Sequence, residues 1–197
     1  GFYQDIQKII SYLPAKRQNL MFSATMPPKI RTLAKEVLNN PVEINVAVSI
    51  PADKIIQVGF VVHDTQKIPM IEHILGAKNF LSVIIFCSTK DSTKQLTKSL
   101  KKLKFSVAEI HSDLDQKERG EVLNQFKAKQ LAILVATDIL SRGIDIEDIE
   151  LVINYDVPHD AEDYIHRIGR TARAAAKGAA FTFISEREQG LFGQIEK

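Results

Sequence analysis

Short apolar runs alternate with segments of helical periodicity along most of the chain. The runs are rich in Val, Ile and Phe, as expected for strands that are covered on both faces. Between them apolar residues recur every three or four positions, for example Ile68, Ile71 and Leu75, which indicates amphipathic helices. This alternation predicts βα units and an α/β domain with a mostly parallel sheet. The predicted strands are 19–22, 42–46, 55–62, 83–86, 107–110, 133–136, 151–154 and 180–184.

The polar stretch 47–54, which contains Pro51, interrupts this rhythm and is interpreted as a linker. The segment 1–46 before it offers only about two strands and two helices, too little for a core of its own. The segment 55–197 offers about six strands and five helices and is predicted to fold as one domain. We therefore expect 1–46 to be the end of a domain whose body is missing. Its apolar residues should pack on that body: Ile6, Ile9, Ile10, Leu20, Phe22, Leu33, Val37 and Leu38.

Composition narrows the class of protein only a little. The chain has 197 residues, of which 45% are hydrophobic and 25% charged, as in ordinary globular proteins. The only cysteine, Cys87, excludes a disulfide scaffold or a cysteine-based zinc site and is expected to be an inert core residue. There is no secretion signal and no run long enough to span a membrane, so we expect a cytoplasmic protein. Because the chain opens with Gly1, we also expect a fragment.

Polar residues follow four of the predicted strands, at the edge where ligands gather in open parallel sheets. These residues could also do no more than cap the helices that follow. In chain order, the segments are Cys87 to Lys90, His111 to Asp113, Thr137 and Asp138 with Arg142, Gly143 and Asp145 close behind, and Tyr155 with Asp156.

The sharpest feature is the segment Tyr164 to Arg173, where arginines recur at every third position as Arg167, Arg170 and Arg173. On a helix this spacing places them along one face. Guanidinium groups so close together repel one another unless an anion or carboxylates lie among them, and their geometry suits phosphates. The alternative is a solvated basic face. The phosphate interpretation would fail if the arginines were held in internal ion pairs, away from the strand-end edge.

A second basic feature lies on the predicted helix 91–103, which carries Lys94, Lys98, Lys101 and Lys102 opposite its leucines. This face could follow a phosphate backbone, although such faces are more often simply solvated. Several motifs are absent: a G-x-x-x-x-G-K-[ST] phosphate loop, G-x-G-x-x-G, H-E-x-x-H and G-x-S-x-G. A self-sufficient nucleotide hydrolase and a Rossmann dehydrogenase are therefore disfavoured.

Taken together, these residues resemble a DEAD-box ATP-dependent RNA helicase, from just after its DEAD tetrapeptide through its second RecA-like domain. The resemblance rests on five motifs in order, and the run His111 to Gln116 resembles a bacterial member. The motifs are S-A-T at Ser23 to Thr25, motif IV at Val83 to Lys90, Q-x-x-R at Gln116 to Arg119, motif V at Ala136 to Asp145, and motif VI at Tyr164 to Arg173.

The resemblance implies a RecA-like three-layer α/β/α domain, preceded by the tail of a first RecA-like domain that holds ATP, its Mg²⁺ and the DEAD carboxylates. It also implies a role for each matching residue. Arg170 and Arg173 correspond to arginine fingers that approach the γ-phosphate, Arg167 and His166 to residues that link this helix to the first domain, and Asp145 with Gly143 to the nucleotide contact. Thr89, Arg119 and Thr137 fall where members touch RNA phosphates, Gln116 and Arg142 where they brace that edge, and Ser23 and Thr25 in the motif that couples hydrolysis to strand separation.

The chain also departs from the family pattern. Ala172 replaces a usual Gly, and the run 174–176 is Ala-Ala-Ala where Gly and a basic residue are common. Because Ala favours helix, the arginine helix is expected to run further here. Without the resemblance, helix capping would be the favoured role here, with Thr25 as the N-cap before Pro27 and Pro28.

Two functions remain open from the sequence. The first is the second half of a monomeric ATP-dependent RNA helicase that binds RNA without sequence preference and is inactive alone. The alternative is a non-catalytic module that binds RNA or a protein partner.

Overall fold

The computed structural model describes residues 2–23, 26, 28–45, 55–138, 146, 149–171 and 178–196. The chain divides into two compact units, 1–48 and 49–197. The first contains helices α1 (Tyr3–Ser11) and α2 (Pro28–Val37), and the side chains of Tyr3 and Gln7 donate to the Glu36 carboxylate. The predicted strands at 19–22 and 42–46 are wrong for all the residues described there, which lie in no strand. A strand needs a hydrogen-bonded partner, and a local apolar run does not supply one.

The apolar residues of the first unit that were expected to pack on a missing domain differ in their exposure to solvent. Ile9, Leu20 and Phe22 are 61%, 68% and 90% exposed. Leu33, in contrast, is only 5% exposed. The packing of these residues on a missing domain stays a prediction.

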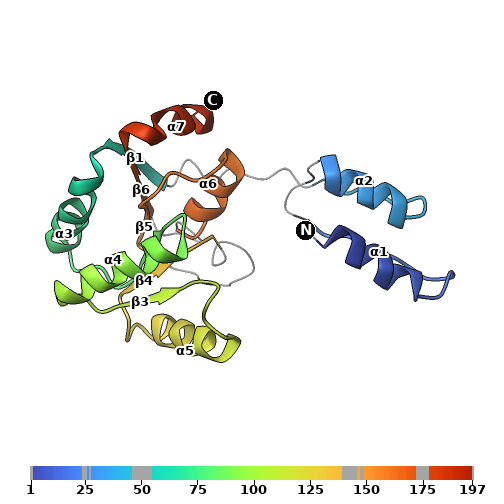
Figure 1. Cartoon of the computed structure of the whole chain (residues 1–197), viewed down its shortest axis with the longest axis horizontal. Helices are drawn as coiled ribbons and strands as arrows, with labels where there is room; N and C mark the ends of the chain where they lie inside the picture. The colour runs from blue at the N-terminus through green and yellow to red at the C-terminus, as the bar shows by residue number, and fades with distance from the viewer. Residues whose placement is uncertain are drawn as a thin grey trace. The chain divides into compact units, whose positions relative to one another are not determined.

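The second unit is an α/β domain built on six parallel strands (Figure 1). The strand order is β1-β6-β5-β2-β4-β3, and every neighbouring pair is parallel, which confirms the predicted fold class. The strands are β1 (Ile55–Val61), β2 (Val83–Phe86), β3 (Val107–Ile110), β4 (Ile133–Ala136), β5 (Leu151–Asn154) and β6 (Gly178–Ile184). The helices are α3 (Lys67–Ala77), α4 (Lys90–Lys102), α5 (Gln116–Lys127), α6 (Ala161–Ile168) and α7 (Gln189–Ile195), with 3-10 turns η2 (Asp64–Gln66) and η3 (Glu186–Glu188).

Two apolar clusters sandwich this sheet and complete three layers. Side chains alternate between the faces, so that Val83 and Ile85 of β2 point into one cluster while Ile84 and Phe86 point into the other. The first cluster is covered by α3 and α4, through residues such as Leu96. The second is covered by α5 and α6. All four β2 side chains are fully buried, which explains why the strand is a continuous apolar run.

Cys87 directly follows β2 and is fully buried. Burial raises the pKa of its thiol to about 12, so the reactive thiolate is scarce at neutral pH. The interpretation of Cys87 as a core residue is confirmed.

Candidate functional site

The carboxyl ends of four adjacent strands, β5, β2, β4 and β3, meet at one edge of the sheet. Phe86 at the end of β2 lies in register with Asn154 of β5 and Ala136 of β4, and Ala136 lies beside Ile110 of β3. The polar segments that follow these strands therefore begin side by side. We call this the strand-end edge, and it has the arrangement predicted from the sequence.

Helix capping accounts for part of the polar content of this edge. The Thr89 hydroxyl accepts a hydrogen bond from the Ser92 N–H at 3.1 Å and caps α4, while Asp115 and Asp160 cap α5 and α6 in the same way. Thr89 is nevertheless exposed, so its hydroxyl can reach a ligand as well. Capping and ligand contact are compatible at this position.

Arg167 of α6 is fully buried at the strand-end edge, under the ends of β2, β4 and β5. Its Nε and Nη2 donate to the two Asp138 oxygens at 2.7 and 2.9 Å, in a two-bond fork. Its Nη1 donates to the Asp156 carbonyl at 2.9 Å, and its guanidinium lies 5.3 Å from the Phe86 ring centroid. Arg167 thus ties the helix to three strand ends.

This geometry corrects the expectation for Arg167. The side chain has no exposed surface and is held in an internal ion pair, so in this conformation it cannot meet an external phosphate or a separate domain. Carboxylates among the arginines were one of the possibilities expected from the sequence, and Asp138 is such a carboxylate. The interpretation of the segment as a phosphate-binding element therefore depends on Arg170 and Arg173.

The arginine segment is also not one continuous helix. Helix α6 ends at Ile168 with Gly169 as its C-cap, and a Cβ at Gly169 would lie 2.9 Å from the Ile165 carbonyl oxygen. Thr171 then forms a bridge to Ile149 and donates its hydroxyl hydrogen bond to the Ile149 carbonyl. The expected single helical face and the longer helix are therefore wrong: Arg167 lies on α6, whereas Arg170 lies in the turn that follows it.

Among the basic residues of this segment that the structure describes, His166 and Arg170 are partly exposed. The Nδ1 atom of His166 is buried and has no hydrogen-bond partner within the described part of the chain, and the same holds for Oγ1 of Thr137 at the end of β4. Buried polar atoms of this kind are costly unless a further group completes them. A water molecule or a ligand group could complete the hydrogen bonding of these atoms.

The remaining predicted residues are distributed as follows. Arg119 lies in the first turns of α5, where its Nη2 donates to the Leu114 carbonyl at 3.3 Å, and Gln116 is the exposed first residue of that helix. Ser23 is an exposed residue of the first unit. Five predicted residues lie outside the described residues: Thr25, Arg142, Gly143, Asp145 and Arg173.

A buried lysine at the same edge was not predicted from the sequence. Lys67 opens α3 and is only 2% exposed, and its ammonium lies 3.2 Å from Glu188, 3.5 Å from Asp64 and 3.5 Å from Asp156. The ammonium also lies 5.0 Å from the Tyr155 ring centroid. Tyr155 and Asp156 were identified as strand-end residues, but the cluster was not, because its other members are far apart in the sequence and share no local spacing.

The Lys67 cluster contains a carboxylate with a lowered pKa. Burial alone would raise the pKa of Glu188, but hydrogen bonds from the Ser185 hydroxyl and from the Val157 and Ser185 N–H groups, together with the Lys67 charge, lower it overall. Glu188 is therefore an anion that compensates the buried lysine.

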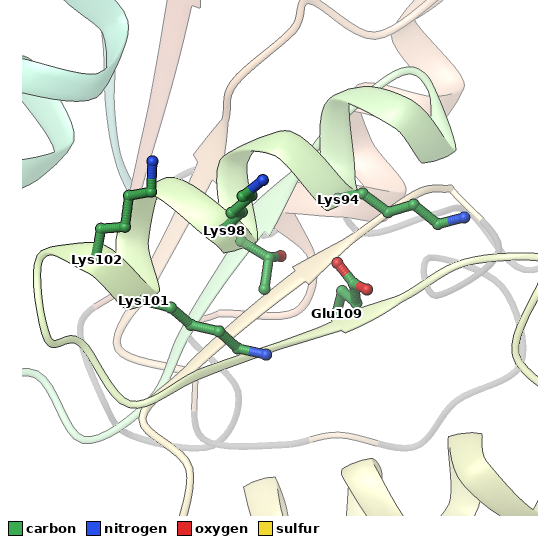
Figure 2. Close-up of a pocket in the computed structure, with 6 residues that line it drawn as sticks. Lys94, Lys98, Lys101, Lys102 and Glu109 are labelled. Atoms are coloured by element: carbon green, nitrogen blue, oxygen red, sulfur yellow. The ribbon is translucent and has the colours of Figure 1, made fainter.

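The basic face of α4 borders a hollow of about 460 Å³ that is lined by Thr97, four lysines and Glu109. Figure 2 shows Lys94 and Lys101 on either side of Glu109, while Lys98 and Lys102 point away from it. Nearer the strand-end edge, Lys90 and Lys94 both bind Asp113, at 3.0 and 2.7 Å. Hydrogen bonds from these two lysines lower the pKa of Asp113 to about 2. Part of the positive charge on α4 is thus already paired.

Two kinds of feature are absent from the described residues. They contain no group of three or more His, Cys, Asp or Glu side chains that could hold a metal ion. They also contain no helix with the length and apolar character needed to cross a bilayer.

A family model described as the helicase conserved C-terminal domain matches residues 66–175. The chain is 46% identical over 192 residues to DEAD-box ATP-dependent RNA helicase 14 of Arabidopsis thaliana, covering 95% of this chain and 31% of that protein. It is 40% identical over 198 residues to the ATP-dependent RNA helicase DbpA of Bacillus subtilis, covering 100% of this chain and 41% of that protein. The chain therefore spans a third to two fifths of the length of these relatives. Because they include a plant and a bacterial protein, a bacterial origin stays a prediction.

Solved structures show the same likeness. A DEAD box protein of Methanococcus jannaschii is 39% identical, with a TM-score of 0.70 over 100% of this chain and 53% of that one. Dbp5 of S. cerevisiae bound to RNA and ADP BeF3 is 29% identical, with a TM-score of 0.86 over 98% of this chain and 52% of that one. The chain belongs to the helicase conserved C-terminal domain family and contains the C-terminal helicase domain of a DEAD-box RNA helicase.

Proposed function

We propose that this chain provides the second RecA-like domain of an ATP-dependent RNA helicase, which closes over ATP carried by a first domain. In this proposal residues 1–46 are the last part of that first domain and 47–54 the linker. The observation that carries the proposal is the convergence of an arginine segment and phosphate-suited side chains at one edge of a parallel sheet. Family membership supports it.

The role of the arginines follows from the electrostatics of phosphoryl transfer. The reaction needs positioning and charge stabilisation more than covalent chemistry. Arg170 and Arg173 are proposed to bring their charge to the γ-phosphate when the two domains close. Arg167 acts differently in our proposal, because its fork on Asp138 fixes α6 beneath Arg170. Asp145 and Gly143 are proposed to contact the nucleotide, whose Mg²⁺ is held mainly by the first domain.

The RNA contacts are proposed to lie along the same edge. Thr89, Arg119 and Thr137 would contact phosphates, while Gln116 and Arg142 brace the surrounding backbone. Contacts to phosphates carry little sequence information, so binding should be indifferent to sequence. Closure then requires both ligands, which links the affinities for ATP and RNA. Ser23 and Thr25 are proposed to couple hydrolysis to local strand separation.

The proposal is tested by complementation. The isolated chain should not hydrolyse ATP, because its sequence contains no G-x-x-x-x-G-K-[ST] loop. Mixing it with a separately produced first domain and RNA should restore hydrolysis at least in part. Arg170→Ala should then lower the hydrolysis rate by about 10³-fold or more, the usual contribution of an arginine finger.

The matched control is Lys78→Ala, which removes an exposed cation near the opposite end of the strands. It should leave hydrolysis unchanged. Equal activity of Arg170→Ala and the unmodified chain, with both folded by circular dichroism, would exclude the finger role.

The alternative function, a non-catalytic binding module, predicts something different. RNA affinity would fall with salt and depend on Arg119 and Thr137, but no combination with a first domain would give RNA-stimulated hydrolysis. The complementation assay therefore separates the two functions.

A further inference from the structure

Asp156, at the end of β5, contacts two segments to which the proposed function gives different ligands. Its Oδ2 accepts a hydrogen bond from the Ser88 N–H at 2.8 Å, directly before Thr89, which caps α4. Its backbone carbonyl accepts a hydrogen bond from Arg167 Nη1 at 2.9 Å, on α6. One residue therefore joins the turn that holds the proposed RNA contact Thr89 to the helix that precedes Arg170.

The Asp156 side chain is itself held in place. Its Oδ1 lies 3.5 Å from the ammonium of Lys67, which is 2% exposed. Val157, the next residue, donates its N–H to Glu188 at 2.9 Å, and Glu188 also binds Lys67 at 3.2 Å. A displaced Asp156 would leave a buried ammonium with less compensating charge, which is costly. The strand end is thus clamped at both its side chain and the following backbone group.

We propose that Asp156, clamped by Lys67, is a positioning residue that couples the RNA contact at Thr89 to the nucleotide contact at Arg170. This inference rests on the proposed function. RNA that orders the Ser88–Thr89 turn also fixes Asp156, and through its carbonyl the guanidinium of Arg167. Both segments are held by Asp156. Binding of RNA to one segment therefore also orders the other, and ATP then binds at a lower entropic cost. Neither Asp156 nor Lys67 needs to touch a ligand.

The opposite end of the same strand provides a matched control. Glu150 directly precedes β5, and its carboxylate accepts the Leu81 N–H at 3.1 Å and pairs with Lys78 at 3.0 Å. Like Asp156, it joins the flank of β5 to the flank of β2 through a backbone N–H and a lysine. It lies at the amino end of the strands, away from both proposed ligand contacts. A purely structural role of Asp156 would lower the stability of the domain without lowering the coupling between the two ligands.

The experiment uses the full-length helicase with its first domain. The affinity for a single-stranded RNA is measured with and without a non-hydrolysable ATP analogue, and the ratio of the two is the coupling factor. Asp156→Ala should reduce this factor by about tenfold, the size of effect expected when the partly buried Ser88 N–H loses its acceptor. Asp156→Asn should retain most of it, because the amide oxygen can still accept the Ser88 N–H. Glu150→Ala, which removes a more exposed carboxylate, should leave it within about twofold.

Each outcome has a distinct meaning. If the unmodified helicase shows no coupling and Arg170→Ala changes nothing, the proposed function is wrong. If coupling is present and Asp156→Ala retains it, or Glu150→Ala loses it equally, this inference alone is overturned. Should Asp156→Ala fail to fold, Lys67→Gln provides the test, because it removes the clamping charge while its amide can still donate to Glu188. An unchanged coupling factor in folded Lys67→Gln would also overturn the inference.

Discussion

Arg167→Met is the substitution that best tests the internal role of Arg167. The change keeps much of the apolar stem over Phe86 and removes the guanidinium, which donates to the Asp138 carboxylate, the Asp156 carbonyl and the Asn154 side chain. Removing one partner of a buried ion pair costs about 3–5 kcal/mol of unfolding free energy. Because the Asp138 side chain is 28% exposed and can regain some water, we expect the lower end, about 3 kcal/mol.

Urea unfolding followed by far-ultraviolet circular dichroism measures this loss, since the chain has no tryptophan. With a slope of about 1–3 kcal/mol per molar urea, the midpoint should fall by roughly 1–3 M. The control is Arg187→Ala, whose side chain is 81% exposed and pairs with Asp64. An exposed pair contributes about 0–1 kcal/mol, so its midpoint should barely change.

A double variant separates the ion pair from general packing. Asp138→Leu combined with Arg167→Met should be more stable than the sum of the single effects predicts, because no buried charge is then left unpaired. The reasoning is refuted if Arg167→Met costs no more than Arg187→Ala, or if the two effects simply add.

Two further predictions concern Glu188 and the lysines of α4. The pKa of Glu188 is lowered in the folded chain, so its stabilising contribution is complete above the ordinary pKa of 4.5 and is lost as the pH falls through the lower pKa of the folded state. Glu188→Gln should therefore flatten the pH dependence of the urea midpoint below about pH 4.5. An unchanged profile would contradict this. For α4 we expect Lys98→Gln with Lys101→Gln to change RNA affinity by less than about twofold, as a solvated face would, with Lys127→Gln and Lys129→Gln as the matched control pair. If the slope of log RNA affinity against log salt concentration became smaller by about 1.4, or roughly 0.7 per cation, in the α4 variant alone, α4 would instead bind the phosphate backbone of the RNA.

The sheet could be predicted closely from the sequence because its strands are buried on both faces. The bounds of β2, β3, β4 and β5 match the apolar runs, each of which ends at polar residues. β6 begins earlier than predicted, at Gly178, because pairing with Ile55 of β1 extends it through small residues that carry no pattern. The incorrectly predicted strand at 19–22 also shows that strand pairing is not visible in local sequence, since apolar character alone does not provide a pairing partner.

The site was predicted less completely, because its decisive contacts join residues far apart in the chain. The polar strand ends were found, since each directly follows a recognisable strand. The pairing of Arg167 with Asp138 and of Lys67 with Glu188 depends on how helices pack on the sheet, which local spacing does not encode. The end of α6 was missed because the prediction rested on the helical preference of the alanines. The bridge between Thr171 and Ile149 that follows the helix joins residues far apart in the chain, so local sequence does not reveal it.

The strand order has a consequence for how the domain is made. Within the described sheet, β1 is the first strand to be synthesised, and its neighbour β6 is the last. About 120 residues separate these partners, so at about 5–20 residues per second the apolar β1 segment waits on the order of 6–25 seconds without its neighbour. During that interval its backbone groups and exposed side chains are open to aggregation or to capture by chaperones.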